Sequence, residues 1–179
     1  MRVYSSIIVI LLFLNSCGNK DETKIPHFGV KPVVPSLILK DHKDFLDKLK
    51  VITSYEDSTG LAARELYEVM EFHFKEEEDY VLPPLGILPL LAKGELPKES
   101  GKIIQLTEKF RENSDAMLAE HQMIKHFLGE MMAAAWREKH PEILGYDKAL
   151  EKHAELEEGI LFPAVLLIGD YLKLRDKDL

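Results

Sequence analysis

Hydrophobic residues recur at steps of three and four along most of the chain, the spacing that places them on one face of an α-helix. Four such stretches are visible, at about 36–52, Leu61–Leu82, Lys98–Lys139 and Pro141–Phe162. No run of alternating Val or Ile residues with hairpin turns interrupts them. The pattern predicts an all-α fold, an antiparallel, up-down-up-down four-helix bundle within residues 36–179.

Residues that start or stop helices mark the ends of these stretches. Ser36 is a favoured capping residue for the first helix, and the cluster Asp57–Gly60 is expected to end it. The Leu-rich segment Pro83–Pro97 is expected to pack across one end of the bundle. Pro163 is expected to interrupt the fourth helix, so that Ala164–Leu174 forms a short, apolar C-terminal helix.

Six polar residues stand on the otherwise apolar faces of the four helices, and they repeat in order. Each half of the chain has a helix with one histidine, followed by a helix with His-x-x-x-Glu, a second Glu and, further on, a proline. The six residues are His42, His73, Glu77, His121, His153 and Glu157.

Helical residues four apart lie on the same face, so each His-x-x-x-Glu pair presents an imidazole and a carboxylate to one point. Burying a carboxylate without a partner costs several kcal/mol, whereas a whole domain is stable by only about 5–15 kcal/mol. Metal ions supply the missing charge, so we predict a dinuclear site of iron, manganese or zinc in the bundle. The simplest arrangement gives each ion the two histidines of one half, with Glu77 and Glu157 as bridges.

Composition fits a folded domain and excludes several classes of protein. The chain has 179 residues, 46% of them hydrophobic, which is enough for one globular domain and some extra sequence. Its net charge is −8 and it has no basic stripe, so we do not expect it to bind nucleic acid. The single cysteine, Cys17, excludes an internal disulfide and a cysteine-built zinc site.

The N-terminus has the features of an export signal. The apolar run Ile7–Leu14 is too short to span a bilayer and suits the central part of a signal peptide. The following Leu14–Gly18 resembles a bacterial lipobox, whose cysteine becomes the lipid-modified first residue. We interpret residues 1–16 as a lipoprotein signal peptide and 17–35 as lipidated Cys17 with a flexible linker. This predicts a lipid anchor on the exported side of a membrane of the bacterial cell envelope. A plain signal peptide and a buried or anchoring helix are the alternatives.

The paired His-x-x-x-Glu motifs, each followed by a proline, resemble those of the hemerythrin family, specifically the HHE cation-binding domains of bacteria. The resemblance covers residues 36–163. It implies a non-haem centre of two iron ions, with manganese or zinc as alternatives, that binds dioxygen (O2), nitric oxide (NO) or related small ligands. The ligands that it implies are the six residues named above.

The sequence departs from the oxygen-carrying hemerythrins in two places. Those proteins use a fifth histidine four residues from another on the third helix, and the two positions at that distance from His121 hold Met117 and Lys125. They also use an aspartate one residue beyond the position of Glu157. A more open iron pair follows, which favours sensing, iron handling, or peroxide and nitric oxide chemistry over reversible oxygen carriage. Met117 and Lys125 are candidates for lining the ligand pocket.

Three further polar residues lie close to the candidate ligands in the sequence. Glu78 and Glu158 lie about 100° around the helix from the two carboxylate ligands, so we interpret them as solvent-facing. Hydrogen bonding to a ligand histidine is the alternative for both. His126 lies about 140° from His121 and is expected to be exposed or peripheral.

Taken together, these features predict a metal-binding protein rather than an enzyme. The first hypothesis is a di-iron protein of the cell envelope that binds or senses dioxygen, nitric oxide or peroxide, or that handles iron. A di-iron oxidase or peroxidase is one alternative. A helical bundle with a structural zinc or manganese site is the other. The sequence does not identify a protein partner.

Overall fold

The structure is a computed structural model, and we describe its residues 32–176. These residues form helices and contain no strand, so the predicted all-α class is confirmed. The long helices are α1 (Ser36–Ile52), α2 (Ser58–Glu76), α4 (Ser100–Glu138), α5 (Tyr146–Leu156) and α6 (Phe162–Asp176). The short ones are α3 (Leu88–Leu91), two 3₁₀ turns at Pro83–Ile87 and Pro141–Ile143, and two π-helical turns at Glu77–Val81 and Glu157–Leu161.

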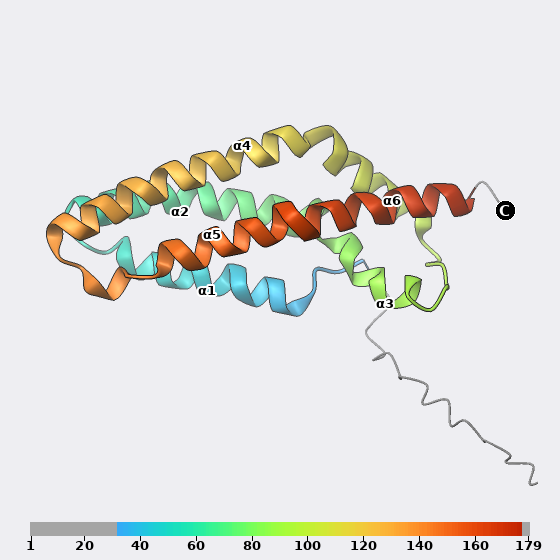
Figure 1. Cartoon of the computed structure of the whole chain (residues 1–179), viewed down its shortest axis with the longest axis horizontal. Coiled ribbons are helices and arrows are strands. Elements are labelled where there is room, and N and C mark those ends of the chain that lie inside the picture. The colour runs from blue at the N-terminus through green and yellow to red at the C-terminus, as the bar shows by residue number, and fades with distance from the viewer. Residues whose placement is uncertain (1–31, 177–179) are drawn as a thin grey trace, which may run out of the picture.

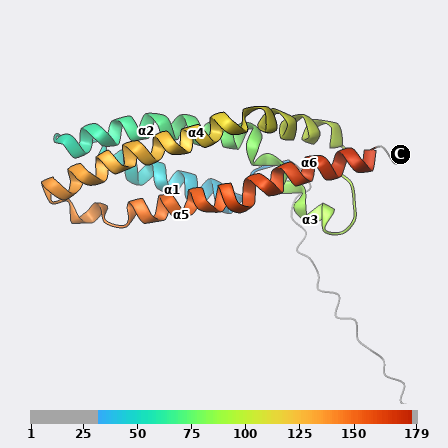
Figure 2. The same cartoon turned by 45° about the horizontal axis from the view of Figure 1, so that its top comes forward.

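The long helices lie side by side. Figures 1 and 2 show α1, α2, α4 and the rod formed by α5 and α6 next to one another, with the chain reversing its direction at each connection. α2 packs along both α1 and α4, and α4 also packs against α5 and α6. α1 lies beside α5, where the ring of Phe45 stands edge-on to Tyr146 and the Tyr146 hydroxyl donates a hydrogen bond to the Phe45 carbonyl at 3.3 Å.

Two apolar clusters fill the interior. The first joins α1 and α2 to the second half of α4 and the start of α5, and it includes Leu66, Met70 and Leu128. The second joins the first half of α4 to α6 and to the segment after α2, from which Leu85 is buried. Along α2, α4 and α5 the candidate ligands lie between these two clusters. The apolar side chains thus surround the polar residues on both sides.

Three helix starts differ from the prediction, and one of them is that of α5, which begins at Tyr146 because Pro141 opens a separate 3₁₀ turn. The N-cap of α1 is Pro35, whose carbonyl accepts hydrogen bonds from the first turn, so Ser36 is already helical and caps nothing. α2 begins at Ser58, earlier than expected, because the Asp57 side chain caps it and the Glu138 carboxylate accepts its first two N–H groups. Glu138 comes from the end of α4, so this stabilisation depends on a contact between distant parts of the chain.

The fourth helix does not stop at Pro163. α6 begins at Phe162 and continues the line of α5 in Figure 1, because proline in the first turn of a helix lacks only an N–H without a helical partner. The π turn that joins the two helices adds one residue to that turn and so rotates the positions after it. Phe162 is therefore buried, whereas Ile160, which an ideal α-helix would place on the same face as His153, is 60% exposed.

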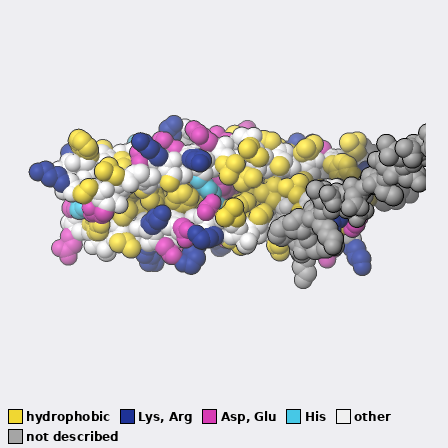
Figure 3. Space-filling view, turned by 60° about the horizontal axis from the view of Figure 1, so that its bottom comes forward, with side chains coloured by type: hydrophobic (Ala, Val, Ile, Leu, Met, Phe, Trp, Pro, Cys, Tyr) yellow, Lys and Arg dark blue, Asp and Glu magenta, His cyan; other side chains and the backbone are white. Residues whose placement is uncertain are grey.

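Some predictions concern residues outside the described part. The predicted signal peptide at 1–16, Cys17 and most of the linker belong to them and stay predictions. Among the helices of residues 32–176, none is both long and apolar enough to cross a membrane. On the face drawn in Figure 3, hydrophobic side chains gather toward one end, and histidine occupies only small areas of the surface.

His140 joins the two connections at the α1–α2 end of the molecule. Its Nε2 lies 2.7 Å from Oδ2 of Asp57, and its Nδ1 lies 2.9 Å from Oε1 of Glu142. The Tyr55 hydroxyl donates to the same Glu142 oxygen at 3.1 Å. The hydrogen bonds with Asp57 and Glu142 raise the pKa of His140 above its usual value, so the fold favours the protonated ring.

A raised pKa means that His140 stabilises the fold fully below the pKa of an unfolded histidine, about 6.5. This stabilisation is lost as the pH rises through the folded pKa. His140→Gln should therefore lower Tm more at about pH 5.5 than at about pH 9. Thermal unfolding of variant and wild type at both pH values measures this, with the exposed His126→Gln as control. Equal losses of Tm at the two pH values would contradict the assignment.

Candidate metal centre

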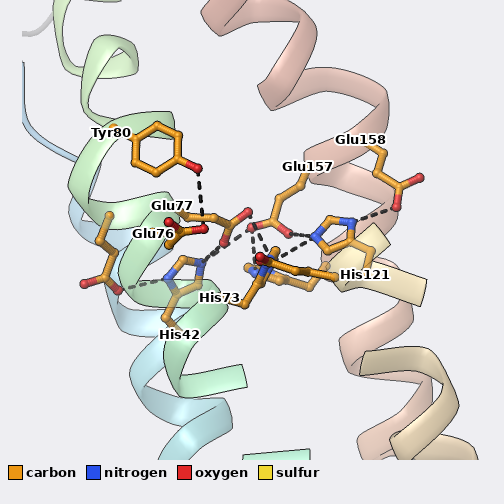
Figure 4. A network of polar contacts seen from close by, with 11 residues as sticks. His42, His73, Glu76, Glu77, Tyr80, His121, Glu157 and Glu158 are labelled. Carbon is orange, nitrogen blue, oxygen red and sulfur yellow. Dashed lines mark hydrogen bonds and ion pairs between the residues drawn. The ribbon is translucent and has the colours of Figure 1, made fainter. Parts of the chain in front are cut away.

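The six candidate ligands meet in the middle of the bundle. His42 comes from α1, His121 from α4, and the two His-x-x-x-Glu pairs from the ends of α2 and α5. All six are buried, the most exposed being His153 at 8%. Figure 4 shows the labelled residues among them pointing toward one another from helices that are far apart in the sequence.

Both carboxylates occupy the same local structure. Glu77 and Glu157 each begin a π-helical turn directly after an α-helix. Such turns are rare and frequently lie at functional sites. The shared spacing of the two motifs is therefore matched by the same backbone conformation, which presents one carboxylate from each half of the chain.

The histidines form two groups, and their pairing within each half of the chain was predicted wrongly. Nε2 of His73 lies 3.0 Å from Nε2 of His121, and the ring of His42 stands edge-on to that of His153 at 5.1 Å between centroids. Each group takes one histidine from each half, because α2 packs along α4 and α1 lies beside α5. With the nearest carboxylate oxygens, both groups have the spacing of metal ligands.

Both carboxylates face the two groups at once. Glu77 has Oε1 3.5 Å from Nε2 of His73 in one group and Oε2 3.5 Å from Nε2 of His42 in the other. Glu157 likewise has Oε2 3.5 Å from Nε2 of His121 and Oε1 2.9 Å from Nε2 of the remaining histidine. This is the geometry of carboxylates that bridge two ions, the role expected for both.

Three histidines donate a hydrogen bond from Nδ1 to a further carboxylate. The pairs are His42 with Glu78 at 2.9 Å, His73 with Glu120 at 2.9 Å and His121 with Glu158 at 2.7 Å. Glu78 and Glu158 are thus partly exposed, but each also accepts a hydrogen bond from a candidate ligand histidine. This favours the alternative in which they support a ligand over that of solvent-facing residues. Glu120 was missed, although its place before His121 repeats that of Asp41 before His42.

The hydrogen bonds from Nδ1 fix the tautomers of His73 and His121, and the lone pairs on their Nε2 atoms then face each other. A carboxylate only accepts, so His73 and His121 carry their protons on Nδ1 and have a lone pair on Nε2. Burial lowers the pKa of His73 and keeps its ring neutral. The two Nε2 atoms, 3.0 Å apart, then have no proton between them. Other buried atoms without a hydrogen-bond partner are Nε2 of His42 and His153, both oxygens of Glu77 and Oε1 of Glu157. Metal ions would satisfy these atoms, so the residues fit a metal centre.

The surroundings shift the pKa values of the two carboxylates in opposite directions. Burial, and then the charge of Glu157, raise the pKa of Glu77 well above its usual value. Burial acts in the same direction on Glu157, but the nearby imidazoles of His153 and His42 outweigh it and lower its pKa to about 2. Ionisation of Glu77 is therefore unfavourable without a cation, and a metal ion would supply the compensating charge.

A cavity of about 240 Å³ reaches the ligands between α4 and α5. It is lined by His73, His121, His153 and Glu157 together with exposed side chains that include Lys125 and Glu155. Lys125 thus stands at the pocket, as expected, whereas Met117 lies in the second apolar cluster and does not line it. His126 is exposed beside Glu130.

The fold and the site define a helical, cation-binding domain. The profile of the hemerythrin HHE cation-binding domain matches residues 34–165, which is most of the chain. The chain therefore belongs to the hemerythrin HHE family, and the resemblance inferred from the motifs is confirmed. No curated protein and no solved structure matches the chain.

Glu77→Gln removes a buried carboxylate and keeps its shape. In the metal-free protein the change should leave Tm equal or higher, because Gln is always neutral whereas ionisation of the buried Glu77 is unfavourable. It should also reduce the rise in Tm on adding metal, because one bridging oxygen is lost. Thermal unfolding with and without metal measures both effects, with the exposed Asp79→Asn as control. A variant that keeps the full metal-induced rise would show that Glu77 is not a ligand.

Proposed function

We propose that the domain is an up-down-up-down four-helix bundle that holds two non-haem iron ions. The proposed ligands are His73 and His121 for one ion, His42 and His153 for the other, and Glu77 and Glu157 as bridges. The observation that carries the proposal is the pair of Nε2 lone pairs that face each other at 3.0 Å. A mixed set of imidazole and carboxylate favours iron, manganese or zinc over magnesium, calcium or copper(I).

We further propose that the centre binds or senses dioxygen, nitric oxide or peroxide, or takes up iron itself. Two histidines and two shared carboxylates leave each ion with open coordination positions. The cavity between α4 and α5 offers small molecules a path to them. Iron would supply the affinity for such ligands and the capacity for electron transfer. The protein's own part is to hold the rings, through Glu78, Glu120 and Glu158, and to keep bulk water out.

Metal analysis and optical spectra of the purified full chain, with and without air, test this function. We expect about two irons per chain and visible absorption that changes with dioxygen or nitric oxide. The double variant Glu77→Ala/Glu157→Ala should lose the metal. Iron that stays bound in the double variant would refute the ligand set. Stoichiometric zinc or manganese in protein from native cells would favour a structural role instead.

A di-iron oxidase or peroxidase is the second candidate. The cavity favours it, because the ionisable side chains of Lys125 and Glu155 line the same space as the ligands and could move protons there. Catalytic turnover of peroxide with an added reductant distinguishes this candidate from reversible binding. A protein that binds the ligand without consuming it is not such an enzyme.

We also propose that the domain is attached to a membrane of the bacterial cell envelope through a lipid on Cys17. The lipobox-like Leu14–Gly18 and the proline-punctuated segment that leads to α1 support this. Cys17→Ser should move the protein from the membrane to the soluble fraction of the producing cells, and should abolish incorporation of labelled fatty acid. A Cys17→Ser protein that still sediments with membranes would contradict the lipid anchor.

A further inference from the structure

The four histidines are not equally supported. Nδ1 of each of three histidines, His42, His73 and His121, donates a hydrogen bond to a carboxylate. Figure 4 shows the bond from His42 to one carboxylate and the bond from His121 to Glu158. Among the described residues, no acceptor bonds Nδ1 of His153. His153 is also the most exposed of the four, and it lines the cavity. The His73–His121 pair therefore has two carboxylate supports, and the His42–His153 pair has one.

The internal repeat of the chain identifies the residue that makes this difference. Glu120 precedes the single histidine of the second half and reaches across to His73 of the first half. Its counterpart in the first half is Asp41, which precedes His42. The histidine that Asp41 would reach by the same relation is His153.

The rings of the two pairs face each other in a similar way. His73 faces His121 with ring centroids 4.6 Å apart, and His42 faces His153 at 5.1 Å, both edge-on. Asp41 is partly buried on α1, beside α5, but its side chain is one methylene shorter than that of Glu120. No hydrogen bond joins Asp41 to His153. The fourth ring thus lacks a carboxylate partner, and the position that corresponds to Glu120 holds a shorter acid.

A carboxylate on the second ring nitrogen fixes the orientation of a ligand histidine and makes the coordinating nitrogen a stronger donor. Resting on the proposed metal centre, we infer that the two metal positions are unequal. The His73–His121 position fills first and holds its ion tightly, and the His42–His153 position fills second and releases its ion first. Asp41, in the place of a glutamate, is the positioning residue that sets this order.

Metal binding and release by the full chain test the order. Under anaerobic conditions, Fe²⁺ added to the metal-free protein should bind in two steps whose dissociation constants differ by about 10–100-fold. Release of the loaded protein's iron to a coloured chelator should be biphasic, with equal amplitudes. One phase should be slow and the other fast.

Three variants assign the phases. Asp41→Glu should slow the fast phase toward the slow one, because it restores the missing carboxylate. Glu120→Asp should speed the slow phase, because it makes the second half like the first. Asp47→Glu, an exposed acid on α1, is the matched control and should change neither phase.

The outcomes separate this inference from the proposed function. Protein that binds no metal refutes the metal centre and the inference with it. Two ions released in a single phase refute only the inference. A biphasic release that Glu120→Asp leaves unchanged refutes the assignment of the slow phase to His73 and His121. If Asp41→Glu leaves the fast phase unchanged, Asp41 does not set the order.

Discussion

Two carboxylates and four imidazoles are buried at one depth of the helical domain, and the rest of the structure is arranged around them. Glu77 and Glu157 are almost fully buried, and the Nε2 atoms of His73 and His121 face each other at 3.0 Å. Apolar clusters on both sides offer these atoms no polar partner, and the cavity between α4 and α5 reaches them from the surface. The clusters and a bound cation would therefore support each other, since the clusters surround the polar atoms with apolar side chains and a cation would compensate their burial.

The two adjacent glutamates of each motif have different roles at this centre. The first of each pair, Glu77 or Glu157, points into the site from the start of a π turn. The second, Glu78 or Glu158, accepts a hydrogen bond from a histidine of a different helix. One short stretch of sequence thus supplies a candidate ligand and also orients a candidate ligand on another helix, which gives both adjacent acids a role in each copy.

Much of this could be predicted from the sequence, because hydrophobic spacing fixes which face of a helix is buried. That face contains all six candidate ligands, so spacing was enough to select them. Spacing does not say which helix lies opposite, and for that reason His42 was paired with His73 rather than with His153. It also assumes ideal α-helices, so the π turn that buries Phe162 and exposes Ile160 could not be foreseen. Glu120 and Glu138 act on residues far away in the chain, and no local pattern marks such contacts.

The two halves repeat their candidate ligands but not the segments that follow them. After the first π turn, Pro83 and Pro84 lead the chain into a 3₁₀ turn and α3, whereas the second π turn continues into α6. α6 packs so tightly on the first half of α4 that a Cβ on Gly169 would lie 2.1 Å from Oγ1 of Thr107. The cavity lies beyond this contact, where α4 faces α5 and Lys125 stands at the surface. The residues that line the cavity come from the repeated helices and not from α3 or α6. Access is therefore set where α4 faces α5, and the side chains there, Lys125 and Glu155 among them, bear on which molecules reach the centre.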